Sequence, residues 1–169
     1  FVNQPIVNIK LIATDEGGLS VSDDFTITII PNEPIELIYI PDPNFELALI
    51  AQGIDSDGII NQQLKRSDAE AVTNLVVNSN EIADLTGIEG FANLETLSCF
   101  ENLLTTLDVS NNRELRGLNC DMNQIDELIL PDNPGFVSLS CKKNQLTSLD
   151  LSAYSELTFL NCSDNLITD

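Results

Sequence analysis

Residues 94–114 read LETLSCFENLLTTLDVSNNRE, and the next 21 residues, 115–135, read LRGLNCDMNQIDELILPDNPG. Aligning the two stretches places Leu over Leu, Cys over Cys and Asn over Asn. The segment 136–156, FVSLSCKKNQLTSLDLSAYSE, repeats the pattern with Phe136 in place of the first Leu, and a fourth copy begins at Leu157. A fixed period of this length is typical of proteins built from stacked repeats.

Four columns of residues recur every 21 positions. They are Leu94, Leu115, Phe136 and Leu157; Leu97, Leu118, Leu139 and Leu160; Cys99, Cys120, Cys141 and Cys162; and Asn102, Asn123, Asn144 and Asn165. A degenerate earlier copy from Leu75 to Leu85 fits with one extra residue, so the repeats occupy 73–169. Alternation along each strand sends Leu and Cys inward. Because one unit cannot bury that face alone, we expect a solenoid of parallel β-strands with a continuous core.

The unit L-x-x-L-x-C-x-x-N resembles the leucine-rich repeat family, and within it the short bacterial type with a 21-residue unit called IRREKO-like. The resemblance implies a leucine-rich repeat solenoid. It also implies an extracellular or cell-surface location, and a role in holding a protein or carbohydrate ligand.

We interpret the Asn and Cys columns as structural ladders. Each Asn stands where the chain leaves a strand, and its amide can pair with turn backbone groups that would otherwise be buried without a partner. Each Cys replaces a core Leu. Parallel Cβ vectors make the disulfide dihedral angle hard to reach, and a linear stack offers no tetrahedral ligand set. We therefore expect reduced thiols, no metal and no cofactor, with disulfides as the alternative.

Residues 35–72 differ from the repeats and predict a helical N-terminal cap. Asp42 and Pro43 are a typical helix start, and Gly53 a typical stop. The stretch Ser67-Asp68-Ala69-Glu70 has the pattern of a capping box that opens a second helix. Between them, the spacing of Asp55-Ser56-Asp57-Gly58 does not match a calcium-binding EF-hand loop, so we interpret it as an acidic turn. The opening, Pro41 to Phe45, is similar to the caps of bacterial repeat proteins.

Residues 1–32 alternate apolar and polar side chains, which predicts a β-hairpin with its turn at Asp15 to Gly18. The stretch 13–28 resembles the last two strands of a cadherin-like β-sandwich domain, of which this hairpin would be a remnant. Leu19 replaces the Pro of the cadherin motif, and 31–34 lacks the acidic linker, which weakens a calcium site at Asp15. The chain starts without a signal-peptide pattern and stops inside a repeat, so we expect it to be truncated. The last coil is then either labile or covered by end-to-end self-association.

Composition removes several classes of function. The chain carries 7 basic and 27 acidic residues, a net charge of −20, and lacks the clustered basic face that nucleic acid requires. No apolar run reaches the ~20 residues of a membrane helix, so we expect no membrane insertion. It has no histidine, which excludes imidazole catalysis and imidazole zinc sites. We therefore predict that the protein is not an enzyme.

The outward side chains of the repeats decide what the solenoid contacts. Small polar residues dominate, and large apolar ones are the informative exceptions. The candidate partner-binding residues are Phe100, Met122, Lys142, Phe159, Asn119 and Asn161. On the second strand column, Asp108 and Asp150 would lie about 10 Å apart, too far for a retaining glycosidase pair and marginal for an inverting one. The alternative to an interaction module is a passive structural spacer or stalk between other domains.

Overall fold

The computed structural model describes residues 6–14, 20–28 and 35–168, with side chains described from residue 35 onward. The chain divides into two compact units, residues 1–35 and residues 36–169.

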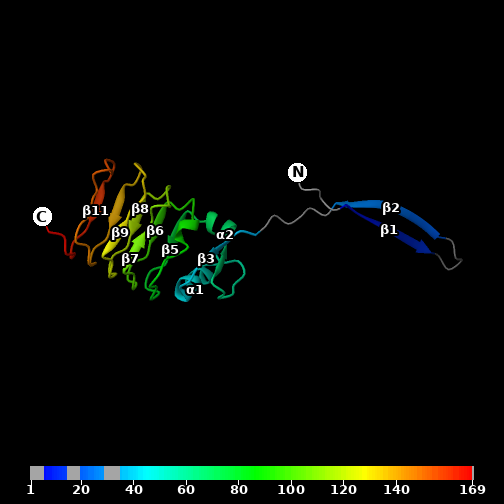
Figure 1. The fold of residues 1–169 in the computed structure, drawn as a ribbon, viewed down its shortest axis with the longest axis horizontal. Coiled ribbons are helices and arrows are strands. Elements are labelled where there is room, and N and C mark those ends of the chain that lie inside the picture. Colours follow the sequence, from blue (N-terminus) through cyan, green and yellow to red (C-terminus); the bar gives the residue numbers. More distant parts are fainter. Residues whose placement is uncertain (1–5, 15–19, 29–34, 169) are drawn as a thin grey trace. The chain divides into compact units, whose positions relative to one another are not determined.

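The first unit is an antiparallel β-hairpin. Strand β1 (Ile6–Thr14) pairs with β2 (Ser20–Thr28), with Ile6 opposite Thr28 and Thr14 opposite Ser20 (Figure 1). The predicted hairpin is therefore present. Its predicted turn, with Asp15 and Gly17 of the cadherin-like motif, lies outside the described residues. Two strands do not by themselves identify a cadherin-like domain.

The second unit is a solenoid whose coils each contribute one strand to a parallel sheet. The strands are β5 (Asn74–Val76), β6 (Thr96–Ser98), β8 (Gly117–Asn119), β10 (Ser138–Ser140) and β11 (Phe159–Asn161). They lie in the order β11-β10-β8-β6-β5 (Figure 1). Leu75 pairs with Leu97, Leu97 with Leu118, Leu118 with Leu139, and Leu139 with Leu160. This register confirms the 21-residue period and the extra residue of the first copy.

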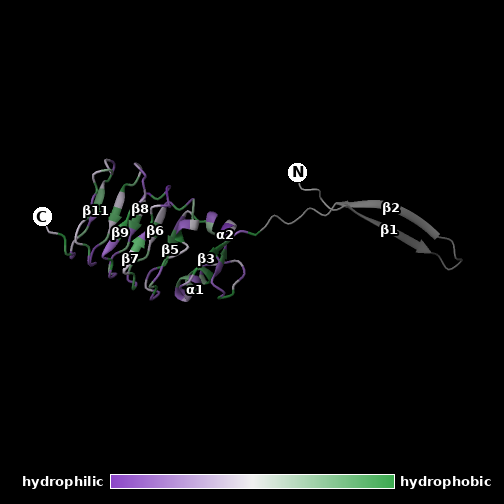
Figure 2. Ribbon diagram, in the orientation of Figure 1, coloured by the Kyte–Doolittle hydropathy of each residue, from purple (hydrophilic) through white to green (hydrophobic). Residues whose placement is uncertain are grey.

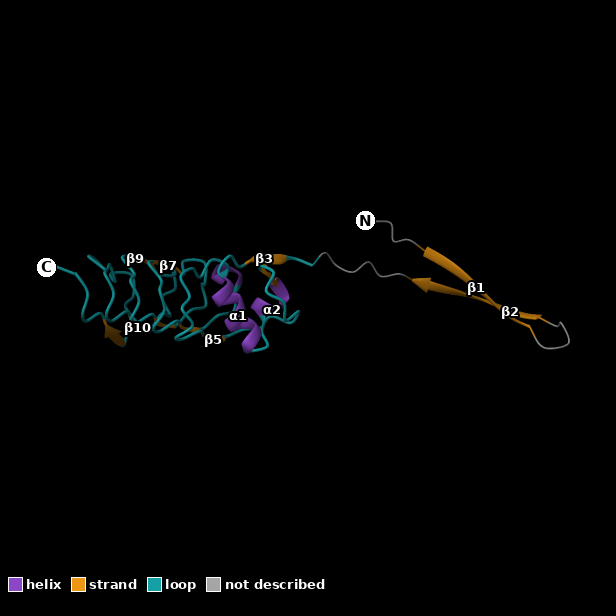
Figure 3. Ribbon diagram, turned by 90° about the horizontal axis from the view of Figure 1, so that it is seen from below, coloured by secondary structure: helices purple, strands orange, loops and turns teal. Residues whose placement is uncertain are grey.

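A second, shorter parallel sheet lies across the coils from the first (Figure 3). It pairs β7 (Thr106–Asp108) with β9 (Glu127–Ile129). The corresponding residues of the next coil, 148–150, form no strand in the described structure. The core lies between the two sheets, and hydrophobic and hydrophilic residues alternate along the coils in Figure 2. Leu97, Leu118 and Leu139 expose 2% or less of their surface, as the inward columns predict.

The cap combines two short strands with two helices. Strand β3 (Leu37–Tyr39) pairs antiparallel with β4 (Gln63–Lys65), and they are joined by helix α1 (Pro43–Ala51) and followed by α2 (Arg66–Glu70). The first coil contains a 3-10 turn, η1 (Ile88–Gly90). The predicted start and stop of α1 are confirmed, because Asp42 caps the helix and Gly53 follows it with φ of 69°.

Two carboxylates hold the cap together. Asp42 Oδ1 accepts from the backbone N–H groups of Asn44 and Phe45, while its Oδ2 accepts from Ala83 and Asp84 of the first coil at 2.7 and 3.0 Å. The helix cap is thus also a tie to the solenoid. The fully buried Glu46 accepts from the backbone N–H groups of residues 61–63. Three such bonds offset the cost of burying its charge.

The predicted capping box at Ser67 is wrong. Helix α2 begins at Arg66, and Lys65 at its N-cap makes no side-chain capping bond. The Arg66 N–H donates to the Glu36 carbonyl at 2.8 Å, so the β3–β4 pairing determines where the helix begins. Ser67 therefore lies inside the helix and not at its cap.

Two glycines bring the cap close to the first coil. A Cβ on Gly87, whose φ is 103°, would overlap Ile40 Cδ1 and lie 2.8 Å from the Tyr39 carbonyl oxygen. A Cβ on Gly90 would overlap the side chain of Ile38. Only glycine allows β3 to approach η1 this closely, because every other residue carries a Cβ atom.

Asp55 is a buried carboxylate with an unpaired oxygen. It exposes 4% of its surface, and its Oδ2 makes no hydrogen bond, while its Oδ1 accepts from the Asp57 N–H at 3.3 Å. Burial raises the pKa of Asp55 above its ordinary value. The surrounding stretch is an ordinary turn, in which Asp57 accepts from the Ile59 N–H.

We expect Asp55→Asn to stabilise the protein at neutral pH. Because the folded-state pKa is raised, the ionised form opposes folding above that pKa, and the penalty disappears below the unfolded-state pKa. The stabilisation by the substitution should therefore shrink as the pH falls toward 3. Urea titrations of both proteins at pH 7 and pH 3 measure it. If Asp55→Asn changes the free energy of unfolding by the same amount at pH 7 and at pH 3, the unpaired charge is not the cause.

Candidate partner-binding face

Each ladder asparagine connects its own coil to the coil before it. The Asn123 Nδ2 group donates to the carbonyls of Cys120 and Cys99 at 3.1 and 3.0 Å, and its Oδ1 accepts from the Leu104 N–H at 3.1 Å. Asn102, Asn144 and Asn165 make the equivalent bonds. These bonds occupy both ends of each amide, so the column is not available to a ligand.

The residue before each ladder asparagine has a left-handed backbone conformation. These residues are Glu101, Met122, Lys143 and Asp164, with φ from 54° to 57°. This backbone conformation is costly for a residue with a side chain. The turn requires it, because the turn brings the asparagine amide to the carbonyls that it binds.

The cysteine column is a stack of free thiols among the described residues. Cys99, Cys120 and Cys141 are buried, and Cys162 of the last coil is half-buried. Burial raises the pKa of Cys99 and Cys141 to about 12 and also raises the pKa of Cys120. The thiolate is the reactive form, so these three thiols are chemically inert in the folded protein.

We expect iodoacetamide at pH 8 to label about one thiol per folded chain, at Cys162, and four in denaturant. Mass spectrometry of peptides under non-reducing conditions identifies the labelled residues. Cys162→Ser should remove the labelling of the folded chain. Fewer than four labelled thiols in the denatured chain would indicate disulfides.

The outward side chains of the first sheet form one surface, which we call the strand face. It consists of Asn74, Val76, Thr96, Ser98, Gly117, Asn119, Ser138, Ser140, Phe159 and Asn161. None of these ten residues is charged, although the chain has a net charge of −20. A groove of about 360 Å³ runs over this face and is bounded at one end by Phe159.

Gly117 lines the groove without a side chain of its own. A Cβ there would lie 3.8 Å from Thr96 Cγ2 and 3.9 Å from Ser138 Cβ, which is ordinary contact. The backbone therefore does not require glycine at this position. Its effect is to leave space between the neighbouring strands.

The structure places the predicted partner-binding residues in two rows. Phe159, Asn119 and Asn161 lie on the strand face, and Phe159 exposes 51% of its surface. Phe100, Met122 and Lys142 lie in the turns that follow the strands. Phe100 is half-buried and therefore less accessible than predicted.

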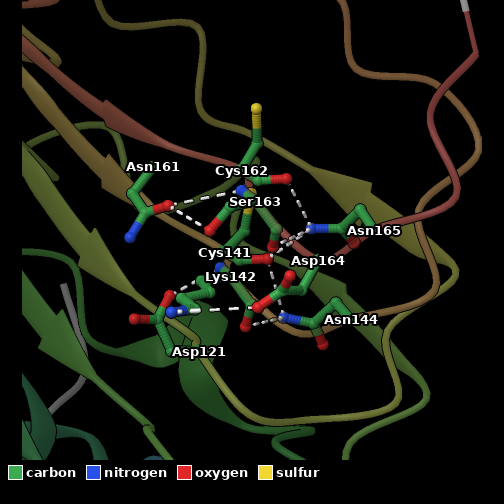
Figure 4. Close-up of polar contacts among 9 residues, drawn as sticks. All are labelled: Asp121, Cys141, Lys142, Asn144, Asn161, Cys162, Ser163, Asp164 and Asn165. Atoms are coloured by element: carbon green, nitrogen blue, oxygen red, sulfur yellow. Dashed lines mark hydrogen bonds and ion pairs between the residues drawn. The ribbon is translucent and has the colours of Figure 1, made fainter.

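Within the turn row, Met122 exposes 38% of its surface. Lys142 is held by two acidic neighbours, since its backbone N–H donates to Asp121 Oδ1 and its Nζ lies 3.8 Å from Asp164 Oδ2 (Figure 4). This turn row thus carries charges that the strand face lacks.

Sequence reasoning missed the contribution of the first coil. Asn74 and Val76 lie on the strand face opposite Thr96 and Ser98, and Val76 exposes 46% of its surface. The degenerate repeat copy at Leu75 and Val77 could have predicted this, because the residues on either side of an inward Leu in a strand point outward.

The two aspartates of the second column are engaged in local turns. The carboxylates of Asp108 and Asp150 each accept from a backbone N–H two residues later, at Ser110 and Ser152. Those bonds lower the pKa of Asp150. In the part of the chain that the structure describes, no group of three His, Cys, Asp or Glu residues could hold a metal ion. No helix described there is long and apolar enough to cross a membrane.

Comparison with known proteins identifies the fold. A scan of protein-family models and a search of curated proteins gave no match. Among solved structures, the chain is similar to the functional domain of InlJ from Listeria monocytogenes, which is described as including a cysteine ladder. The two share 32% identity with a TM-score of 0.69, over 77% of this chain and 29% of that one. The fold is a leucine-rich repeat solenoid.

A second leucine-rich repeat structure supports the same fold. The internalin inlF from Listeria monocytogenes is 20% identical with a TM-score of 0.59, over 78% of this chain and 46% of that one. The present chain thus spans less than half of either neighbour, and its own leucine-rich repeats carry the strand face described above.

Proposed function

We propose that the chain is a non-enzymatic interaction module, which uses the strand face of its leucine-rich repeats to hold a protein or carbohydrate partner. The observation that carries the proposal is the groove of about 360 Å³ on an uncharged face of a strongly acidic molecule. Binding sites are commonly concave, with a few polar groups beside an apolar one, and Phe159 supplies the exposed apolar side chain.

We further propose a secreted or cell-surface bacterial context, which rests on the leucine-rich repeat resemblance. In this arrangement the hairpin of residues 1–32 is the remnant of a cadherin-like domain, residues 35–72 are the cap, and residues 73–169 are the repeats. The cap then has a structural task, because it covers the apolar end of the first coil.

Phe159→Ser should weaken partner binding at least tenfold without changing the melting temperature by more than about 2 °C. Exposed side chains contribute little to stability, while an aromatic anchor is a typical hot spot of binding. The probes are a panel of purified extracellular proteins and an array of immobilised oligosaccharides. Asp108→Ser on β7 is the matched control on the opposite sheet.

Loss of binding in Phe159→Ser alone supports the strand face as the working surface. Equal binding by both variants would assign the activity to another surface. If the unmodified chain retains none of the probes, a passive structural spacer or stalk becomes the better description.

A further inference from the structure

Three neighbouring side chains on the strand face have polar groups without a partner. Ser140 pairs across the sheet with Asn119 on one side and Asn161 on the other. The Ser140 side chain lines the groove, exposes only 9% of its surface, and makes no hydrogen bond to a described residue. Its hydroxyl is not among the fully buried unpartnered atoms of the described residues, so it faces the groove and is free to pair with a ligand.

The two flanking amides have fixed orientations. Asn119 Oδ1 accepts from the Asp121 N–H at 3.1 Å. Asn161 Oδ1 accepts from the Ser163 N–H at 3.3 Å and from its hydroxyl at 2.8 Å (Figure 4). Because backbone donors fix each oxygen, the Nδ2 groups are left over, and neither makes a hydrogen bond to a described residue.

The result is a row of amide, hydroxyl and amide on three adjacent strands, which lie about 4.8 Å apart. The Thr96 and Ser98 hydroxyls on the other side of the groove are already used, since they donate to Asn74 and Asn78. Asn119, Ser140 and Asn161 thus leave free hydrogen-bonding groups between Gly117 and Phe159, where the groove has both open space and an aromatic wall.

We propose that this part of the groove binds a neutral carbohydrate ring. The ring lies in the space over Gly117 and Ser138, its oxygens accept from the Asn119 and Asn161 amides and pair with the Ser140 hydroxyl, and its apolar face stacks against Phe159. This inference rests on the proposed function and names the ligand class for the same face.

The chemistry of the face favours a sugar over the other partners. Protein interfaces concentrate their binding energy in Trp, Tyr and Arg, and the strand face contains none of these. A chain with a net charge of −20 repels acidic glycans and acidic peptides. The neutral donors on an uncharged surface match the oxygens of an uncharged, polyhydroxylated ligand, and a hydroxyl can both donate and accept.

The test uses the full chain on an array of neutral hexose and N-acetylhexosamine oligosaccharides, with sialylated and sulfated ones beside them. Calorimetric titrations with the best neutral binder follow, at low and high salt. We expect binding that changes less than twofold between 0.05 and 0.5 M salt, because no charge pair contributes.

Two variants locate the site. Gly117→Leu should abolish binding by filling the space, whereas Thr106→Leu places the same leucine side chain on the opposite sheet and should leave binding unchanged. Ser140→Ala should weaken binding about fivefold to tenfold, the effect of one lost hydrogen bond. A structural serine would lower the melting temperature when replaced. The unpartnered Ser140 should not.

Each other outcome overturns the inference. Preference for sialylated or sulfated chains would contradict the neutral ligand, and saccharide binding that survives Gly117→Leu would contradict the site. If the folded chain binds no saccharide but captures a protein through Phe159, the ligand class is wrong and the interaction module stands. Failure to bind either kind of probe overturns both proposals.

Discussion

Replacing Asn123 with alanine should lower the free energy of unfolding by about 3–5 kcal/mol. The substitution leaves the N–H of Leu104 unpaired, and it removes one of the two asparagine donors from the carbonyls of Cys99 and Cys120. All of these contacts are buried, so water cannot replace the amide without opening the coil. Urea denaturation followed by circular dichroism measures the loss.

The matched control is Asn111→Ala, because Asn111 is exposed and makes no side-chain hydrogen bond to a described residue. It should change stability by less than about 0.5 kcal/mol. Asn165→Ala provides a graded comparison, since its bonds are only partly buried in the last coil. A loss at Asn123 no larger than at Asn165 would contradict the role of burial.

The second large effect concerns the two glycines at the junction of cap and repeats. We expect Gly87→Ala and Gly90→Ala each to destabilise the protein by about 2–5 kcal/mol. A methyl group at Gly90 overlaps the Ile38 side chain in the core, and one at Gly87 meets Ile40 and the Tyr39 carbonyl. Gly87 adds backbone strain, because alanine is disfavoured at φ of 103°.

Two other glycines separate these causes. Gly53 has φ of 69° with open space around its Cβ position, so Gly53→Ala should reveal backbone strain alone, about 1 kcal/mol. Gly117 has neither strain nor a close contact, so Gly117→Ala should be nearly neutral. Thermal and urea unfolding of the four variants give the ranking. Equal losses at Gly53 and Gly90 would exclude overlap with Ile38 as the main cause.

The repeats were predictable because their contacts recur at one spacing. The Leu and Cys columns are adjacent in space for the same reason that they are periodic in sequence, so the register of β6, β8 and β10 follows from counting. The same reasoning located Phe159 on the outer surface. Alternation needs no knowledge of distant residues.

The remaining features depend on contacts that no local pattern encodes. Gly90 packs against Ile38, 52 positions earlier, and Glu46 binds the backbone of a loop 15 residues later. The start of α2 failed as a prediction because a strand pairing overrode the local capping signal at Ser67. The free hydroxyl of Ser140 was also invisible, since whether a polar group has a partner depends on the orientations of Asn119 and Asn161.

The asparagine ladder has a direction, and this makes the two ends of the solenoid inequivalent. Asn165 satisfies the N–H of Leu146, and Asn144 satisfies that of Ile125, so each coil is completed by the one that follows it. Peeling a coil away at the carboxyl end deprives its predecessor of a buried bond, and that predecessor is then easier to peel. Removing a coil at the amino end has a smaller effect. If the first coil is lost, Asn102 Nδ2 loses the Val77 carbonyl but keeps the Cys99 carbonyl of its own coil. We therefore expect the coils to unfold in order from the carboxyl end, with the coil beside the cap unfolding last.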